Sequence, residues 1–213
     1  LLDSLRFASH PKAHGTNIVF GGSVIAGTRA KKERSKSYNA FSSINYPDIA
    51  VIQDRRIVFY IDDKNHITDR IRFYHKLDDR VFLLKLIPGS NGAIIDSLAD
   101  TTDALIIESF GVGGLPDYGD DEFYQAIKRF VEKGKIVIMA TQVTHEGSDM
   151  SVYQVGKMIK REFSLLESYD MTLEATVAKT MWALQESIDP DGFREKFYKK
   201  INHDIMFSPE QNH

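Results

Sequence analysis

The sequence predicts an α/β protein with a parallel sheet in its larger, C-terminal part. Two observations predict this class. Beyond residue 80, nearly continuous apolar runs alternate with helical segments, which is typical of parallel strands buried on both faces. Before residue 62, shorter apolar runs occur in pairs separated by turn residues, which indicates hairpins. With 213 residues the chain can bury a substantial core.

The first predicted element is an amphipathic helix over residues 1–8, with Leu1, Leu5 and Ala8 on one face. The chain opens in the middle of this helix without a methionine, and we expect that further residues precede it. Any motif that belongs upstream of the helix would then lie outside the 213 residues.

Two hairpins are predicted next. In the first, Asn17–Phe20 and Ser23–Gly27 flank a pair of glycines. In the second, Ile49–Ile52 and Arg56–Ile61 are separated by three polar residues. The segment that follows loses periodicity and gains charge, which favours a linker. We therefore predict a first domain over residues 1–62, a linker over 63–80 and a second domain over 81–213.

The second domain is predicted from its alternation of strands and helices. The three expected strands are buried runs that lack polar alternation, at Val81–Ile87, Ala104–Glu108 and Ile136–Ala140. The expected helices are Ala93–Leu98, Asp120–Lys133, Met150–Phe163, Met171–Glu186 and a charged surface helix near Asp191–Lys200. In the fourth of these helices a stripe of Leu173, Val177, Met181 and Leu184 should face the core, with Asp170 or Thr172 as the cap.

Composition excludes several classes of function. A formal charge of -3 with interspersed signs predicts no nucleic-acid partner, and no apolar run is long enough to predict a membrane partner. The chain has no cysteine, which excludes disulfides and thiolate metal sites and fits a reducing cytoplasm. The seven histidines lack the spacing of a metal site, so we predict neither a metal nor a cofactor.

The loops that follow the predicted parallel strands are where a ligand would gather. One of them, Gly111–Gly114, could cradle a phosphate at a helix N-terminus. However, it matches neither the dinucleotide fingerprint nor a P-loop, and a close-packed turn or a subunit contact explains its glycines better. No G-x-S-x-G nucleophile elbow occurs.

Lys32 is the strongest catalytic candidate, because it follows a strand and a glycine turn instead of lying on a helix surface. A lysine buried at such a point could shuttle a proton or activate a hydroxyl. A surface lysine after a hairpin is the alternative. The residues alone do not decide between the two.

Several motifs together resemble the cytoplasmic, type I L-asparaginase family. They are Gly27-x-Arg29-x-x-Lys32, Asn39-Ala40-Phe41-x-Ser43-x-Asn45-Tyr46-Pro47, Leu84–Gly89, Ile107–Pro116, Thr141-Gln142, Tyr153-x-Val155-Gly156 and Asp170-Met171-Thr172-x-Glu174-Ala175-Thr176-x-x-Lys179. They occur in one order along almost the whole chain. The resemblance implies the C-terminal part of a first α/β domain followed by a flavodoxin-like domain.

The resemblance also implies a reaction. The family hydrolyses asparagine, often with weaker activity on glutamine, through a threonine nucleophile, with Lys32 at the position of the proton relay. The family's two threonine motifs lie upstream of the first helix, so we expect the 213 residues alone to be inactive. His14-Gly15-Thr16-Asn17 looks like one of these motifs, but Asn17 replaces its aspartate and the segment leads directly into a strand. Thr16 is therefore interpreted as strand entry.

In the family, a neighbouring subunit completes the active site. The resemblance thus implies a cytoplasmic homo-oligomer, at least a dimer. Gly114 stands near the place where the periplasmic branch has an asparagine that makes this contact, and Asp149 is a candidate to reach across instead. A loop or helix cap is the alternative role of Asp149. Glu108 stands where some cytoplasmic members have an effector-site arginine, so control by asparagine is not carried over.

Two other functions stay open. One is the asparaginase-like subunit of a glutamyl-tRNA amidotransferase, which shares the fold and would favour a basic surface. The other is a non-catalytic oligomerisation module, which would not need Lys32.

Overall fold

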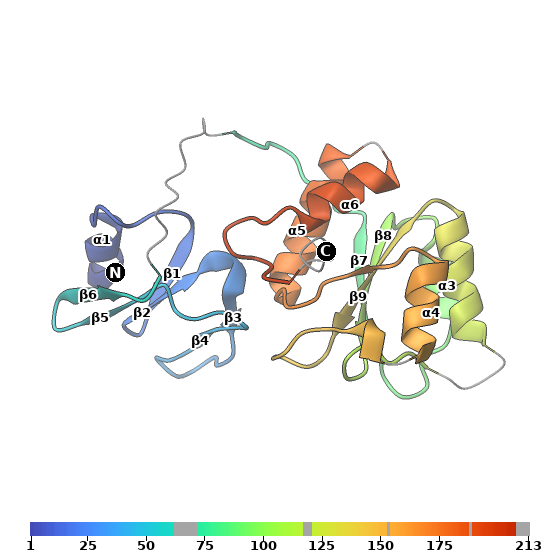
Figure 1. Cartoon of the computed structure of the whole chain (residues 1–213), viewed down its shortest axis with the longest axis horizontal. Helices are drawn as coiled ribbons and strands as arrows, with labels where there is room; N and C mark the ends of the chain where they lie inside the picture. The colour runs from blue at the N-terminus through green and yellow to red at the C-terminus, as the bar shows by residue number, and fades with distance from the viewer. Residues whose placement is uncertain (62–71, 117–120, 153, 188, 208–213) are drawn as a thin grey trace.

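The computed structural model describes residues 1–61, 72–116, 121–152, 154–187 and 189–207. The elements form two parts that lie side by side, an N-terminal part built mainly of strands and a C-terminal part with helices around a sheet (Figure 1). The predicted α/β class is confirmed. The predicted boundary between residues 62 and 63 lies outside the described residues, so the division into domains stays a prediction.

The N-terminal part begins with helix α1 (Leu2–Ala8), which packs beside a four-stranded antiparallel sheet. The sheet has the order β1 (Asn17–Phe20), β2 (Ser23–Ala26), β5 (Ala50–Gln53) and β6 (Arg56–Phe59), and both predicted hairpins are confirmed. The predicted apolar face of α1 is wrong: Leu1 and Leu5 are exposed, and Phe7 is buried instead. Its ring packs against Phe59, with centroids 5.8 Å apart, because the larger aromatic side chain gains more from burial.

A second, two-stranded sheet was not predicted. After a single 3-10 turn over Gly27–Arg29, the chain forms β3 (Ala30–Lys32), which pairs with β4 (Phe41–Ser43). Each strand has only three residues, too few to show a periodic pattern in the sequence. Lys32 therefore lies within a strand.

The C-terminal part is built on a parallel sheet with the order β10-β9-β8-β7. Its strands are β7 (Val81–Lys85), β8 (Ala104–Ser109), β9 (Ile136–Thr141) and β10 (Leu166–Glu167). The first three confirm the positions of the predicted strands, but the expected burial of the first is wrong: β7 lies at the edge of the sheet, and Phe82 and Leu83 are exposed. The two-residue β10 was missed, because its length produces no pattern that a sequence could reveal.

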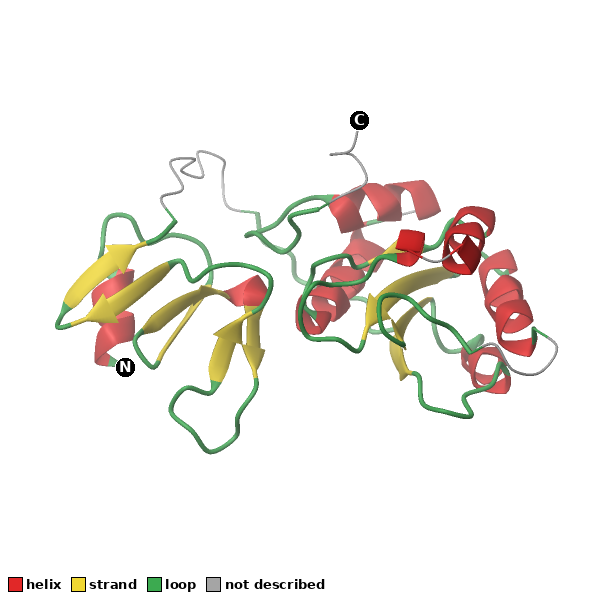
Figure 2. Ribbon diagram, turned by 60° about the horizontal axis from the view of Figure 1, so that its bottom comes forward, coloured by secondary structure: helices red, strands yellow, loops and turns green. Residues whose placement is uncertain are grey.

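Helices cover both faces of this sheet (Figure 2). Alternation along β8 directs Leu105 and Ile107 to one core and Ile106 to the other. The first core is closed by α2 (Ala93–Leu98), α3 (Glu122–Glu132) and α4 (Gln154–Glu162). The second core is closed by α5 (Leu173–Glu186) and α6 (Pro190–Tyr198).

Two predictions about the last helices need correction. The expected apolar stripe of α5 is only partly buried, whereas Thr176 and Thr180 are fully buried. These hydroxyls donate to backbone oxygens one turn earlier, at 2.9 and 2.7 Å, so small polar residues can pack closely without losing hydrogen bonds. Helix α6 is not a surface helix, because Phe193 and Phe197 belong to the core. Thr172 caps α5, as one of the two predicted options.

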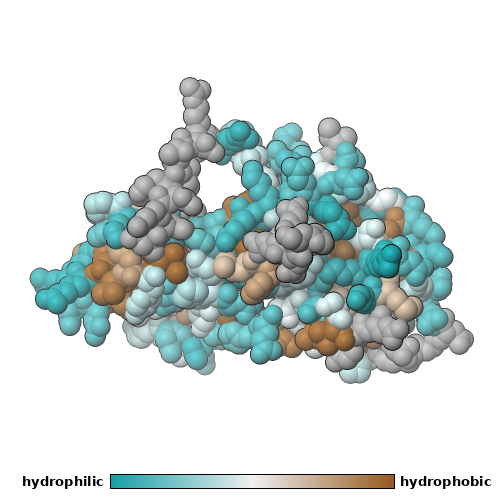
Figure 3. All heavy atoms as spheres, in the orientation of Figure 1, coloured by the Kyte–Doolittle hydropathy of each residue, from teal (hydrophilic) through white to brown (hydrophobic). Residues whose placement is uncertain are grey.

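The surface mixes hydrophilic residues with small, separate hydrophobic patches on the face shown in Figure 3. Within the described residues, no helix is long and apolar enough to cross a membrane.

Tyr198 is expected to make stability fall at alkaline pH. Its buried hydroxyl accepts a hydrogen bond from the Glu167 backbone N–H at 2.9 Å, and burial raises its pKa above the ordinary value of 10.0. Above about pH 10 the unfolded chain loses this proton while the folded chain keeps it. The free energy of unfolding should therefore fall by up to about 1.4 kcal/mol per pH unit from this group.

Urea unfolding between about pH 8 and 11 measures this effect, and Tyr198→Phe provides the control. The variant should be less stable at about pH 8 but less sensitive to pH above about 10. Equal pH slopes for both proteins would contradict the assignment.

Candidate functional site

The two parts of the chain meet at a buried ion pair. The guanidinium of Arg29, at the end of the 3-10 turn, is fully buried and donates to the Asp170 carboxylate at 2.8 Å and to the Asp170 backbone oxygen at 2.6 Å. Asn45 reinforces the contact, since its side-chain amide donates to the same backbone oxygen at 3.1 Å. These bonds fix β3 and the loop after β4 against the start of α5.

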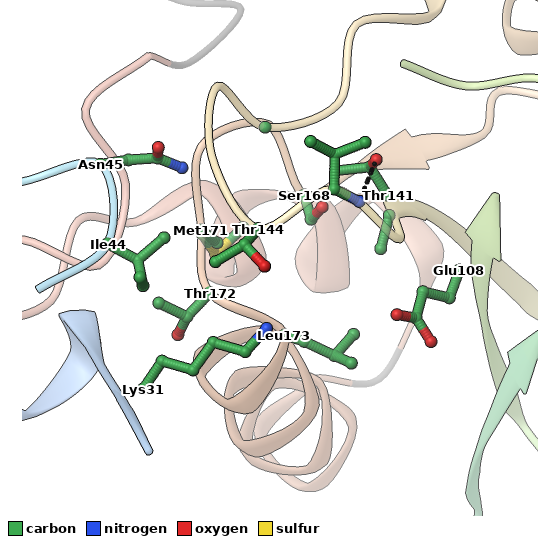
Figure 4. Close-up of a pocket in the computed structure, with 13 residues that line it drawn as sticks. Lys31, Ile44, Asn45, Glu108, Thr141, Thr144, Ser168, Met171, Thr172 and Leu173 are labelled. Carbon is green, nitrogen blue, oxygen red and sulfur yellow. Dashed lines mark hydrogen bonds between the residues drawn. The ribbon is translucent and has the colours of Figure 1, made fainter. Parts of the chain in front are cut away.

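A narrow crevice opens beside this contact (Figure 4). Lys31 and Asn45 line it from the N-terminal part, and Glu108 and Thr141 line it from the carboxyl ends of β8 and β9. Its volume is about 20 Å³, which is room for about one water molecule.

The charges around the crevice are of both signs. Figure 4 shows the Lys31 amine directed into it from one side and the Glu108 carboxylate on the other. Glu108 is mostly buried and accepts a hydrogen bond from the Lys85 amine at 3.1 Å. The negative charge of Glu108 is therefore balanced by the positive charge of Lys85, which belongs to the same part of the chain.

Lys32 lies on the opposite side of β3 from Lys31, because successive side chains of a strand alternate. Its side chain is exposed, and its amine lies 6.0 Å from the centroid of the Phe41 ring. The described residues thus do not supply the burial that a tuned lysine would need. Sequence reasoning missed the neighbouring Lys31 as a crevice residue, because the three residues of β3 show no recognisable strand pattern.

Gly114 closes a tight turn. Its N–H donates to the Phe110 oxygen at 2.7 Å, and its own oxygen accepts from the Phe110 N–H at 3.0 Å. A Cβ at Gly114 would lie 3.2 Å from that Phe110 oxygen, and one at Gly113 would lie 3.0 Å from Met150. The close-packed turn, one of the two predicted roles of this loop, accounts for these glycines.

Asp149 lies next to that turn, on the exposed surface. Its backbone N–H donates to the Val112 oxygen at 2.8 Å, and its carboxylate accepts from the Ser151 N–H at 2.9 Å. It therefore caps the short 3-10 helix Met150–Val152. The cap and a contact with a neighbouring subunit are compatible, because the side chain remains exposed.

Thr16 precedes β1 and is not among the residues that line the crevice. Its backbone oxygen accepts hydrogen bonds from the Gly27 N–H at 2.8 Å and from the Asn202 side chain at 3.0 Å. This is the geometry of strand entry.

In the part of the chain that the structure describes, no group of three His, Asp or Glu side chains could hold a metal ion.

Arg29 and Asp170 are the residues whose importance the sequence did not reveal. Both occur in quoted motifs, but a motif does not say that two of its residues pair across 141 positions. Their signal would be a correlated change in related sequences.

Similarity to known proteins agrees with this architecture. The sequence model described as "Asparaginase, N-terminal" matches residues 1–65, and that described as "Glutaminase/Asparaginase C-terminal domain" matches residues 80–197. The L-asparaginase of Thermococcus kodakarensis is 32% identical over 195 residues, which cover 91% of this chain and 58% of that protein. A glutamyl-tRNA(Gln) amidotransferase subunit from Metallosphaera sedula is 30% identical over 166 residues, or 76% of this chain and 37% of the M. sedula protein.

Solved structures show the same relationship. The thermostable T. kodakarensis L-asparaginase superposes with a TM-score of 0.82 at 31% identity, covering 96% of this chain and 62% of that one. A probable cytoplasmic L-asparaginase from Campylobacter jejuni shares the fold, with a TM-score of 0.74 at 18% identity. The superposition covers 93% of this chain and 64% of the C. jejuni chain. The chain thus spans less than two thirds of these relatives. Because one sequence model covers more than half of it and a second covers its first 65 residues, the chain belongs to the glutaminase/asparaginase family.

Proposed function

We propose that this chain is the lysine-bearing part of a cytoplasmic L-asparaginase, which hydrolyses L-asparagine to L-aspartate and ammonia. The observation that carries the proposal is that family similarity spans both parts of the chain, with Gly27-x-Arg29-x-x-Lys32 leading into β3. The similarity to an L-asparaginase over 91% of this chain supports it.

In the proposed reaction, the nucleophile is a threonine outside these 213 residues. Lys32 draws the proton from the threonine hydroxyl through a relay, and the threonine oxygen attacks the carboxamide carbon. Backbone N–H groups stabilise the oxyanion, and the amide nitrogen leaves as ammonia after taking up a proton. Water then hydrolyses the acyl-enzyme ester and releases aspartate. The exposed position of Lys32 leaves its amine open to such a partner group.

The proposal includes a homo-oligomer, at least a dimer, whose neighbouring subunit contacts the surface around Gly114 and Asp149. These residues belong to adjoining loops, because the Asp149 N–H donates to the oxygen of Val112. Asp149 is exposed and negatively charged, so it could meet the ammonium group of a substrate bound by the neighbour.

The second candidate function is the asparaginase-like subunit of a glutamyl-tRNA amidotransferase. It is favoured by the similarity to a glutamyl-tRNA(Gln) amidotransferase subunit at 30% identity. The overall charge of -3 provides no broad basic surface for tRNA, and we therefore place this function second.

An ammonia assay distinguishes the two functions. A purified polypeptide that contains these residues together with the family's threonine motifs should release ammonia from asparagine, and charged tRNA should not change the rate. Release that requires glutamyl-tRNA and a partner protein would favour the second function. No release by a protein that includes the family's threonine motifs would contradict both.

A further inference from the structure

The segment that follows α6, residues 199–207, runs back to the boundary between the two parts (Figure 1). We call it the clasp. Its backbone oxygens at Asn202 and His203 accept hydrogen bonds from the Thr28 hydroxyl at 2.5 Å and from the Arg29 Nε. The side chain of Asn202 also reaches the N-terminal part, since it donates to the Thr16 oxygen at 3.0 Å.

The clasp is equally well anchored to the C-terminal part. The buried amine of Lys179 donates to the Asp204 carboxylate at 2.6 Å and to the Lys199 oxygen at 2.6 Å. The Asp170 carboxylate, which pairs with Arg29, also accepts from the Met206 N–H at 3.0 Å. One carboxylate thus joins the guanidinium of the N-terminal part to the clasp.

The conformation of the clasp depends on these contacts. Asn202 and His203 both have positive φ, at 46° and 63°, a region that non-glycine residues rarely adopt. Two consecutive residues in this region persist only where surrounding bonds hold them. Arg29 and Thr28 supply two of those bonds, and the His203 ring stacks on Tyr46 with centroids 4.8 Å apart.

The Arg29 guanidinium, immediately before β3, therefore donates three hydrogen bonds, one to His203 and two to Asp170. The backbone oxygen of Arg29 also accepts from the Ile44 N–H at 2.9 Å, which closes the β3–β4 pair. Because side chains alternate along a strand, the orientation of β3 decides which of Lys31 and Lys32 enters the crevice and which faces outward. A rotation of this short strand would exchange their environments.

We infer that Arg29 is a positioning residue, which the clasp and Asp170 hold so that β3 presents Lys32 outward and directs Lys31 into the crevice. The inference rests on the proposed function for its catalytic meaning. Its structural content, the orientation of β3, does not depend on any activity.

The test labels the whole, folded chain with a water-soluble acylating reagent. Mass spectrometry of its fragments then gives the separate reaction rates of the two lysine amines. Lys32 is exposed and Lys31 is half-buried, so Lys32 should react faster in the parent protein. In Arg29→Lys the single ammonium cannot reach all the acceptors that the guanidinium reaches. The ratio of the Lys32 rate to the Lys31 rate should therefore fall at least about threefold, toward one. A residue that only added stability would lower the unfolding midpoint and leave this ratio unchanged.

Arg129→Lys is the matched control, because Arg129 makes a two-bond pair with Asp96 on the surface, far from β3 in sequence. It should leave the ratio unchanged. Thr28→Val, which removes one clasp bond and keeps Arg29, covers the case in which Arg29→Lys fails to fold, and it should lower the ratio in the same direction.

An unchanged ratio in the folded Arg29→Lys protein, or in Thr28→Val where Arg29→Lys does not fold, would overturn the inference. An equal fall in Arg129→Lys would also overturn it. Failure of the proposed function has a different signature: no ammonia would be released by the intact protein, whatever the labelling ratio.

Discussion

Lys32→Ala is expected to lower the rate of ammonia release from L-asparagine by about 10²–10⁴-fold, the usual loss when a group that transfers a proton is removed. In the proposed reaction no other described residue replaces the amine that draws the proton from the threonine. The substitution should change kcat much more than KM, because Lys32 is assigned to the proton and not to substrate binding. The measurement is a steady-state assay of the parent and the variant, each in a polypeptide that includes the family's threonine motifs.

Lys31→Ala is the matched control for this prediction. Lys31 has the same charge and lies next to Lys32, but its side chain lines the crevice on the other side of β3. It should retain most of the parental kcat. Full activity in Lys32→Ala, or a larger loss in Lys31→Ala, would contradict the assignment of the relay to Lys32.

Asp170→Ala is expected to lower the free energy of unfolding by about 3–5 kcal/mol, because it leaves the fully buried guanidinium of Arg29 without its counter-charge. It also removes the acceptor of the Met206 and Phe207 backbone N–H groups. Unmade hydrogen bonds of buried groups add to the cost. Urea unfolding at neutral pH measures the change.

Asp96→Ala is the control, since its partner Arg129 is about half-exposed at 48%. A surface pair of this kind contributes about 1 kcal/mol or less. Similar losses in the two variants would show that the pair at the boundary has no special importance.

The sequence predicted those elements whose patterns are long enough to recognise. The apolar runs of β7, β8 and β9 and both hairpins were identified from their residue patterns, although β8 and β9 are buried and the edge strand β7 is not. The short strands β3, β4 and β10 were missed, because two or three residues carry no period. The burial of Thr176 and Thr180 was missed because their hydroxyls bond within the helix, which residue type alone does not reveal.

The site was predictable to a smaller extent. The motif around Lys32 indicated the family. In the structure Lys32 is the last residue of β3, which follows the turn at Gly27–Arg29. Neither the crevice beside Lys31 nor the pairing of Arg29 with Asp170 could be predicted, because both depend on contacts between residues more than 100 positions apart. Such contacts require the tertiary structure.

The measurement that tests the account most directly is ammonia release from L-asparagine by purified protein whose intact mass is known. We expect release by a polypeptide that contains these residues together with the family's threonine motifs, and we expect Lys32→Ala to abolish most of it. We expect none from the 213 residues alone, whose mass is 24.2 kDa. Lys32-independent release, or release at full rate by a pure 24.2 kDa polypeptide, would contradict the account.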